Sequence, residues 1–131
     1  MINDLSKAQL PPIYKRDGRD CYLDPIRQKL IFITPEETIR QRVISYLMDT
    51  LHVPANMLRV EEHLSHYGIK SKDRADIIVE KFNEEKQETN PLVVIECKAP
   101  GIFLGESQAK QMTGYADALL SDFCMMTNGT D

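Results

Sequence analysis

The sequence has no run of about eighteen apolar residues, so it predicts no transmembrane helix and no membrane partner. No long apolar region follows the first seven residues, and we therefore expect no signal peptide. A phosphate-binding P-loop, a glycine-rich dinucleotide fingerprint and a zinc-spaced Cys/His set are also missing. The 131 residues thus contain neither a motif for a nucleotide-driven motor nor one for a dinucleotide-dependent enzyme.

Cysteine is scarce and widely spaced. Cys21, Cys97 and Cys124 are odd in number, far apart and set among apolar residues. That pattern argues against a disulfide framework and against a zinc site. We expect reduced, mostly buried thiols and a cytoplasmic location.

An excess of basic residues is absent as well. Sixteen Lys and Arg against twenty Asp and Glu give a net charge of −4, and the sequence pI is near 5.4. Phosphate contacts dominate affinity for nucleic acid, so a stand-alone binder usually carries a basic excess. The balance disfavours tight autonomous DNA binding but is compatible with a metal-dependent active site.

The length and the 42% apolar content fit one domain. Residues 1–12, which end in Pro11-Pro12, are predicted to form a flexible arm, and residues 13–131 a single domain. A turn signal at residues 17–20 and a short apolar run at residues 30–33 predict a small, irregular β-element at residues 14–33.

An α/β core is predicted for the remaining chain. Thr34 as N-cap, Pro35 at the first helical position and Glu37 form a capping box, and apolar residues at helical spacing extend this helix to about residue 52. We expect strands at residues 58–64, 74–80 and 92–98, a polar connection at 81–91, a second helix at 106–120 and a last strand at 123–127. The order is helix-strand-strand-strand-helix-strand. A parallel crossover at its end predicts a mixed sheet.

Two of these apolar strands carry acidic residues. If the strands at residues 74–80 and 92–98 pair antiparallel, Asp76 and Glu96 lie opposite one another, because both are equally far from Lys86. Opposed like charges repel unless a cation lies between them. A divalent metal is the economical solution, and magnesium needs only one or two carboxylates besides water. The backbone carbonyl of Cys97 could supply a third oxygen.

Lys98 lies on the same face as Glu96 by strand alternation. There it could orient the attacking water and stabilise charge that develops on a phosphate. Glu-x-Lys alone has little meaning, since residues 84–86 match it inside the polar connection. The alternative is a frayed strand in which Glu96 and Lys98 form an exposed salt network.

Other candidates are less specific. His63 and His66 stand three apart in a segment that reads as strand and turn, so we expect surface histidines rather than a metal site. Glu62 shares a face with apolar residues of its strand and could lean toward the active site. A basic cluster, Lys70, Lys72 and Arg74, could guide a phosphate backbone or belong to a solvated loop.

Several motifs together resemble a known family. Asp76, Glu96-Cys97-Lys98 and Gln111-x-x-x-Tyr115 resemble the Asp…Glu-x-Lys restriction-endonuclease-like superfamily. The closer resemblance is to the N-terminal nuclease domain of type I restriction enzyme R subunits. Further landmarks are Pro35-Glu36-Glu37-x-Ile39-Arg40-Gln41, Arg74-Ala75-Asp76 and Thr127-Asn128-Gly129.

The resemblance implies a restriction-endonuclease-like core and a role for each matching residue. Asp76 and Glu96 would be metal ligands, Lys98 the catalytic lysine, and Glu37 an acidic residue near the metal. Gln111 and Tyr115 would contact the substrate backbone or support the site. Without the resemblance, the capping box already explains Glu37, and the last two could be an ordinary helix edge.

The implied function is a magnesium-dependent endodeoxyribonuclease, with manganese as a substitute, in a restriction system. The implied partners are DNA, a helicase motor region, and specificity and methylation subunits. The chain is then a fragment of such a subunit or a small protein with the same fold. Sequence recognition in such systems lies in another subunit, so no base-specific readout is expected. The alternative is a non-catalytic nucleic-acid-binding or subunit-docking module, which the acidic balance favours; the intact Asp76, Glu96 and Lys98 set favours the enzyme.

Overall fold

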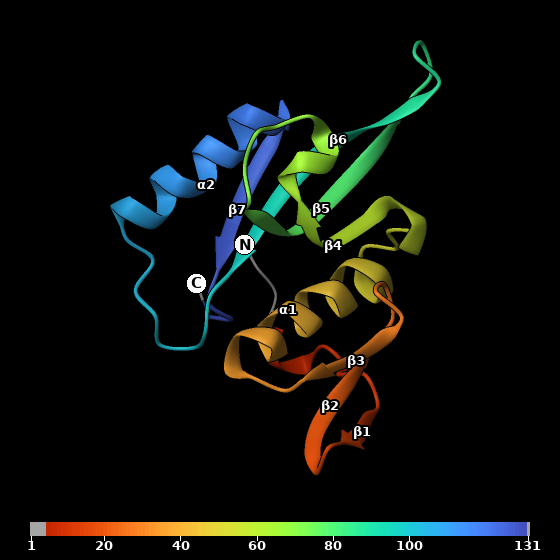
Figure 1. Ribbon diagram of the computed structural model, residues 1–131, viewed down its shortest axis with the longest axis vertical. Coiled ribbons are helices and arrows are strands. Elements are labelled where there is room, and N and C mark those ends of the chain that lie inside the picture. Colours follow the sequence, from red (N-terminus) through yellow and green to blue (C-terminus); the bar gives the residue numbers. More distant parts are fainter. Residues whose placement is uncertain (1–4, 131) are drawn as a thin grey trace.

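The computed structural model describes residues 5–130 and is a mixed α/β fold with two sheets (Figure 1). The N-terminal sheet is antiparallel, with strands β1 (Ile13–Arg16), β2 (Arg19–Asp24) and β3 (Lys29–Phe32) in that order. The second sheet has the order β4 (Leu58–His63), β5 (Arg74–Asn83), β6 (Glu88–Cys97) and β7 (Phe123–Thr127). In it β4, β5 and β6 pair antiparallel, whereas β6 and β7 pair parallel. The predicted mixed sheet is confirmed.

Two longer helices accompany the sheets: α1 (Pro35–Ser45), which continues into a π-helical turn at Tyr46–Thr50, and α2 (Glu106–Leu119). Short 3-10 turns occupy Leu5–Lys7, Ala55–Met57 and Leu64–Tyr67. Within residues 5–130, neither α1 nor α2 has the length and apolar character that crossing a membrane requires.

The start of α1 agrees only in part with the predicted capping box. Thr34 Oγ1 accepts a hydrogen bond from the Glu37 backbone N–H at 3.0 Å, and Pro35 occupies the first turn. The Glu37 carboxylate instead binds the side chains of Arg27, Arg40 and Gln41. The reciprocal cap therefore does not explain this glutamate, which belongs to a buried charge network.

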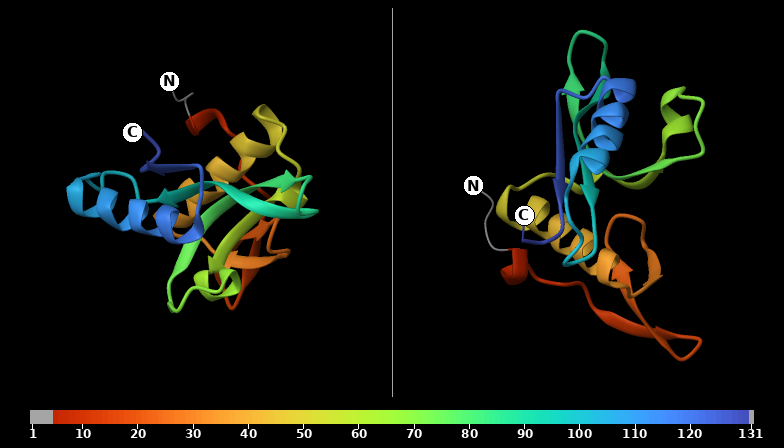
Figure 2. Two further views of the ribbon diagram at one scale, coloured as in Figure 1. Left: turned by 90° about the horizontal axis from the view of Figure 1, so that it is seen from above. Right: turned by 90° about the vertical axis from the view of Figure 1, so that its left-hand side faces the viewer.

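The four-stranded sheet is covered on both faces. Helix α1 packs on one face through Val43 and Ile44, the π-helical turn adds Leu47 there, and α2 contributes Leu119 to the other face. The Leu64–Tyr67 turn lies on the same side as α2 (Figure 2). The N-terminal sheet contacts α1 as well, where Tyr22 Oη and Thr38 Oγ1 are 2.8 Å apart. Helix α1 is thus the element shared by both sheets (Figure 1).

The connection between β5 and β6 is shorter than predicted. The strands continue through polar residues to Asn83 and resume at Glu88, leaving a turn at residues 84–87. This end of the hairpin projects away from both helices (Figure 1), so its side chains need no apolar alternation. A β-bulge between Val79 and Glu80 separates it from the buried half.

Part of the predicted N-terminal arm lies on α1. Residues 1–4 fall outside the described residues. Leu5 is buried in the core, and Arg42 Nη1 donates to the carbonyl oxygens of Ser6 (3.0 Å) and Ala8 (2.9 Å). Residues 5–8 are therefore anchored to the helix.

All three thiols are free, as expected. Cys21 and Cys97 are fully buried, whereas Cys124 is exposed on β7. In the described chain β7 pairs only with β6 and is an edge strand, and this position leaves Cys124 accessible.

Candidate active site

The register of β5 and β6 brings the two predicted carboxylates together. Ile77 pairs with Ile95 and Ile78 with Val94, which is the predicted symmetry about Lys86. One step further along both strands, Asp76 comes opposite Glu96. Asp76 Oδ2 accepts a hydrogen bond from the Cys97 backbone N–H at 2.6 Å. The predicted register is therefore confirmed at the end that carries the acidic residues.

A third carboxylate joins them from the neighbouring strand. Val60 pairs with Ile77 and Glu62 with Ala75, so Glu61 lies opposite Asp76. Glu61 has a φ of 51°, which is rare for a residue other than glycine, and this kink interrupts the alternation of β4. Glu61 therefore faces the site, whereas Glu62 is 3.0 Å from His66 Nδ1.

The cation between these carboxylates in this structure is a guanidinium group. Arg40 of α1 is buried, and its Nη2 lies 2.7 Å from Asp76 Oδ1 and 2.8 Å from Glu61 Oε1. Its Nη1 forms an ion pair with Glu37. Burial lowers the pKa of Arg40, but Asp76 and Glu37 outweigh this effect and raise it, so the group stays charged.

Asp76 and Glu96 differ in their protonation. Burial and the adjacent Asp76 charge raise the pKa of Glu96 to about 9. Burial also acts to raise the pKa of Asp76, but its hydrogen bond with Glu96 and the charge of Arg40 lower it overall. The two shifts run in opposite directions, so Asp76 is the more acidic carboxyl of the pair.

One oxygen of Glu96 is suited to a cation. Glu96 is only 8% exposed, and its Oε1 is buried with no hydrogen-bond partner among residues 5–130. A buried polar atom without a partner calls for an explanation, and a role in binding a cation is one. No three His, Cys, Asp or Glu side chains of the described residues form a metal-binding group. A metal here would be held by Asp76 and Glu96 with backbone and water oxygens, which suits magnesium.

Lys98 follows directly after β6 and is half-buried. Its backbone N–H donates to Thr127 O at 2.9 Å, which continues the pairing of β6 with β7. Its charge counteracts part of the upward shift in the pKa of Glu96, so the two side chains interact electrostatically. The lysine is thus fixed at its backbone beside the carboxylate pair.

Helix α2 contributes the predicted Gln111 and Tyr115. Gln111 is exposed, and its Nε2 donates to Tyr115 Oη at 3.2 Å. Burial and a hydrogen bond with Asp73 raise the pKa of Tyr115 to about 12, with a further contribution from the charge of Glu96. Tyr115 is therefore electrostatically linked to the carboxylates, and Gln111 is linked to Tyr115.

Glu37 reaches Asp76 through Arg40 rather than by direct contact. Its other oxygen, Oε2, accepts hydrogen bonds from Arg27 Nη2 (2.7 Å) and Gln41 Nε2 (3.0 Å). Those two side chains also bind Asp24, which is fully buried on β2. The network thus extends from the central sheet across α1 to the N-terminal sheet.

Sequence reasoning assigned no role to Arg40 or Glu61. A charged residue between the core positions Ile39 and Val43, one turn after Glu37, was the available signal for Arg40. The symmetry argument used for β5 and β6, applied to β4, would have placed Glu61 beside Asp76. The rings of His63 and His66 lie edge to face, 5.4 Å apart, and His66 is exposed.

The fold and the site define a mixed α/β domain whose central sheet ends in a buried acidic cluster beside a lysine. Over residues 35–131 the sequence matches the family described as type I restriction enzyme R protein N terminus. The chain belongs to this family, and the resemblance drawn from its motifs is confirmed. Comparisons with curated proteins and with solved structures gave no match.

Proposed function

We propose that the chain is a metal-dependent endodeoxyribonuclease domain of a restriction system, with a restriction-endonuclease-like core made of α1, β4–β7 and α2. The observation that carries this proposal is the opposition of Asp76 and Glu96, with a buried Glu96 oxygen that has no partner among residues 5–130. Family membership supports the restriction setting. The cytoplasm is the proposed location.

The acidic pair would hold the metal. Asp76, Glu96 and the Cys97 carbonyl oxygen offer hard oxygen ligands, which magnesium or manganese prefers. Bound magnesium would supply a Lewis acid for the phosphoryl oxygen and a water of lowered pKa. Arg40 supports this arrangement from α1, because its charge keeps Asp76 ionised.

Two further elements would act on the substrate. The Lys98 ammonium would orient the attacking water and offset negative charge that develops on the phosphate. The Tyr115 hydroxyl, whose pKa is raised to about 12, stays protonated and would exchange its hydrogen bond with Asp73 for one to a backbone phosphate oxygen. Gln111 would hold that hydroxyl in place through its 3.2 Å hydrogen bond. DNA is thus contacted through its backbone rather than its bases.

Cleavage assays test the proposal directly. Supercoiled, linear and single-stranded DNA would be incubated with magnesium or manganese and either wild type, Lys98→Ala or Lys86→Ala. Lys86 is a matched control because it ends the other Glu-x-Lys match, in the exposed hairpin turn. We expect cleavage by wild type and Lys86→Ala, and none by Lys98→Ala. Equal cleavage by all three proteins would refute the role of Lys98.

Metal binding gives a second test that does not need DNA. Magnesium or manganese should raise the melting temperature of wild type by mass action. Asp76→Ala should abolish this rise, whereas Asp117→Ala, on the exposed surface of α2, should keep it. If wild type and Asp76→Ala were equally insensitive to metal, the catalytic proposal would lose most of its support.

The net charge of −4 favours a second candidate, a non-catalytic module that docks onto nucleic acid or other subunits. Its proposed partners are the helicase motor region and the specificity and methylation subunits of a restriction complex. Absence of both cleavage and metal-dependent stabilisation would favour this candidate.

A further inference from the structure

Two arginines face each other where the N-terminal sheet turns back between β1 and β2. Arg16 and Arg19 are paired across the strands, and the two residues between them have φ values of 52° and 73°, as in a type I′ turn. Like charges directly opposite one another in an antiparallel pair repel. The preceding pair of the same register, Lys15 and Asp20, is instead an ion pair of 3.1 Å. The sequence therefore places two cations where the next step along the strands places opposite charges.

One aromatic ring holds both guanidinium groups. Phe32 of β3 pairs with Cys21, which lies on the same face of β2 as Arg19. The Cζ atom of Arg16 lies 4.4 Å from the centre of the Phe32 ring, and that of Arg19 lies 3.8 Å from it. A cation–π contact orients a guanidinium group without using its N–H donors. The ring thus keeps two positive charges side by side and leaves their donors available.

These donors have no anionic partner within residues 5–130. Neither Arg16 nor Arg19 forms an ion pair there, and the one side-chain hydrogen bond that either makes runs from Arg16 Nη1 to Leu30 O at 3.3 Å. Both side chains are exposed, so a ligand can reach them from solvent. The fork of a guanidinium group matches the oxygens of a phosphate. Two adjacent forks without a carboxylate therefore fit a phosphate that offers oxygens to both.

The distribution of charge along the chain favours a nucleic acid as the source of that phosphate. Residues 13–33, which form the N-terminal sheet, contain five basic and three acidic residues, whereas residues 34–131 contain ten basic and sixteen acidic ones. A polyanion is attracted to such a local basic surface and repelled by the acidic remainder. Membership of a restriction-enzyme family favours nucleic acid over an acidic protein as this polyanion.

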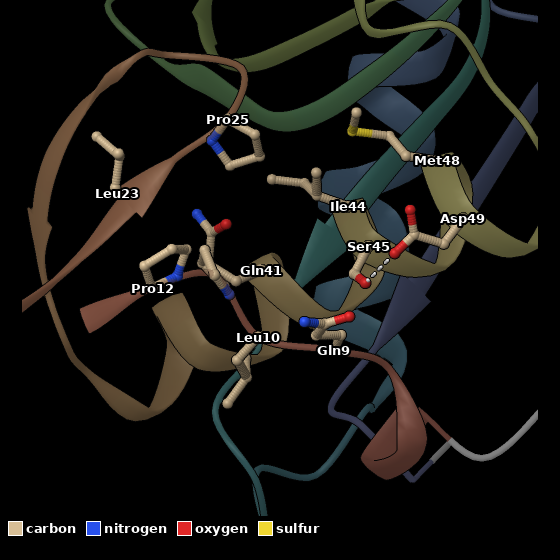
Figure 3. A pocket seen from close by; sticks show the side chains of 11 residues that line it. Gln9, Leu10, Pro12, Leu23, Pro25, Gln41, Ile44, Ser45, Met48 and Asp49 are labelled. Atoms are coloured by element: carbon tan, nitrogen blue, oxygen red, sulfur yellow. Dashed lines mark hydrogen bonds between the residues drawn. The ribbon is translucent and has the colours of Figure 1, made fainter.

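The N-terminal sheet is fixed to α1, and the two arginines face away from the helix. Tyr22 Oη lies 2.8 Å from Thr38 Oγ1, and Gln41 Nε2 donates to Asp24 Oδ2 at 2.7 Å. Tyr22 and Asp24 lie on the face of β2 opposite to that of Arg19. Figure 3 shows the end of β2 and the C-terminal half of α1 on either side of a pocket that both line. The turn itself projects at the end of the molecule away from α2 (Figure 1), so it can meet a large ligand.

We propose that Arg16 and Arg19, held on the ring of Phe32, bind the phosphodiester backbone of a nucleic acid without reading its bases. This contact supplies part of the affinity that the net charge of −4 opposes. No residue of the acidic cluster takes part in it. The inference therefore stands or falls independently of the proposed cleavage.

Fluorescence anisotropy of a labelled DNA duplex of about 20 base pairs tests the contact at several salt concentrations. EDTA is present throughout, so that no metal-dependent cleavage occurs. The full chain is compared with Arg16→Gln/Arg19→Gln and with Lys81→Gln/Lys86→Gln, which removes the same charge from the exposed end of the β5–β6 hairpin.

We expect the arginine variant to bind about tenfold more weakly than wild type, and its plot of log affinity against log salt to be shallower by about two. The lysine variant should bind as wild type does. Equal losses in the two variants would overturn the assignment to the arginines, and so would the absence of binding by wild type at low salt.

Polyglutamate of the same total charge as the duplex is the competitor that represents an acidic protein. We expect it to displace the labelled duplex less effectively than unlabelled duplex does, because guanidinium forks then act on phosphates in preference to carboxylates. Equal displacement by the two competitors would overturn the assignment to nucleic acid.

Wild type also reports the place of the contact, without any substitution. The ring of Phe32 lies under both guanidinium groups, so its NMR signals should shift saturably as the duplex is added. The ring of Phe82, which is exposed on the β5–β6 hairpin, is the control and should keep its signals unchanged. Binding of the duplex that leaves the Phe32 signals unchanged would overturn the location, whether or not the variants fold.

Discussion

Arg40 Nη2 of α1 lies 2.7 Å from Asp76 Oδ1 of β5, and this ion pair joins the first helix to the centre of the acidic cluster. Both residues are buried, and the same guanidinium contacts Glu37 and Glu61. Opposed carboxylates repel unless a cation lies between them, and the positive charge of Arg40 offsets part of this repulsion. A metal and Arg40 would therefore share the negative charge of the cluster.

Replacing Arg40 by Gln should destabilise the fold strongly. Removing one partner of a buried ion pair leaves the others without compensation, and this typically costs about 3–5 kcal/mol. Chemical denaturation would measure the loss. Arg42→Gln is the control, because Arg42 lies on the same helix and donates only to the carbonyl oxygens of Ser6 and Ala8 in the described contacts. If Arg40→Gln and Arg42→Gln lost the same free energy of unfolding, the buried ion pairs of Arg40 would not be a major source of stability.

The same variant should bind metal more tightly. Without the guanidinium, the cluster loses its internal cation, so a divalent ion meets less competition. We expect manganese to raise the melting temperature of Arg40→Gln by more than that of wild type. A smaller rise would show that Arg40 is needed to position the ligands.

Asp24 should make stability depend on pH in the acidic range. Burial raises its pKa, but hydrogen bonds from Arg27 and Gln41 outweigh this and bring the pKa below its usual value. A carboxyl with a lower pKa in the folded state stabilises above its unfolded pKa and loses that contribution as the pH falls through the folded pKa. The free energy of unfolding should therefore begin to drop near pH 4, about the ordinary pKa of aspartate.

Asp24→Asn should lose part of this acid dependence and about 2–3 kcal/mol at neutral pH, because Arg27 loses a charged partner. Urea denaturation at pH values from about 3 to about 7 would measure both the acid dependence and the loss of stability at neutral pH. Asp20→Asn is the matched control on the same strand, since Asp20 forms an exposed pair with Lys15 and should change little. If the free energy of unfolding of Asp24→Asn fell with decreasing pH as steeply as that of wild type, other carboxyl groups would cause the acid dependence.

Two glycines should respond oppositely to alanine. Gly129 has a φ of +96°, and a Cβ there would lie 2.6 Å from Ile39 Cδ1. Gly129→Ala should cost about 1–3 kcal/mol through backbone strain and this contact. Gly114 lies within α2 with nothing near its missing Cβ, so Gly114→Ala should stabilise by about 0.5–1 kcal/mol. Thermal denaturation would show melting temperatures on either side of wild type; a shift in the same direction for both would contradict the packing of Gly129 on α1.

One of the three thiols should react quickly with a thiol reagent. Cys124 is exposed, whereas Cys21 and Cys97 are fully buried, and burial raises the pKa of the Cys97 thiol. We expect one fast equivalent in the native protein, three under denaturing conditions, and no fast phase in Cys124→Ser. Two fast equivalents would contradict the burial of β2 or β6.

Several elements follow from local sequence. The N-cap Thr34 and Pro35 fix where α1 begins, and the last strand was predicted at residues 123–127, where β7 lies. These signals depend on backbone geometry and on apolar spacing, which neighbouring residues determine. The extension of β5 and β6 beyond residues 80 and 92 was not predicted, because exposed strand ends carry no apolar alternation.

The site was predictable to the extent that it depends on one hairpin. Asp76 and Glu96 are brought together by a register that the two strand sequences and their connection already contain. Arg40 could not be placed, because its position depends on how α1 packs on the sheet, whereas the pairing of β4 with β5 is what puts Glu61 opposite Asp76. Contacts between elements that are distant in the sequence are not predicted by the local sequence of either element.

The sequence by itself determined the mixed α/β class, the opposition of Asp76 to Glu96 and the family, since each depends on residue types at fixed spacings. Only the tertiary structure decided which cation lies among the carboxylates and how Glu37 reaches Asp76. The physical reason is that burial and charge pairing depend on the packing of α1 between two sheets, and no local pattern encodes that packing.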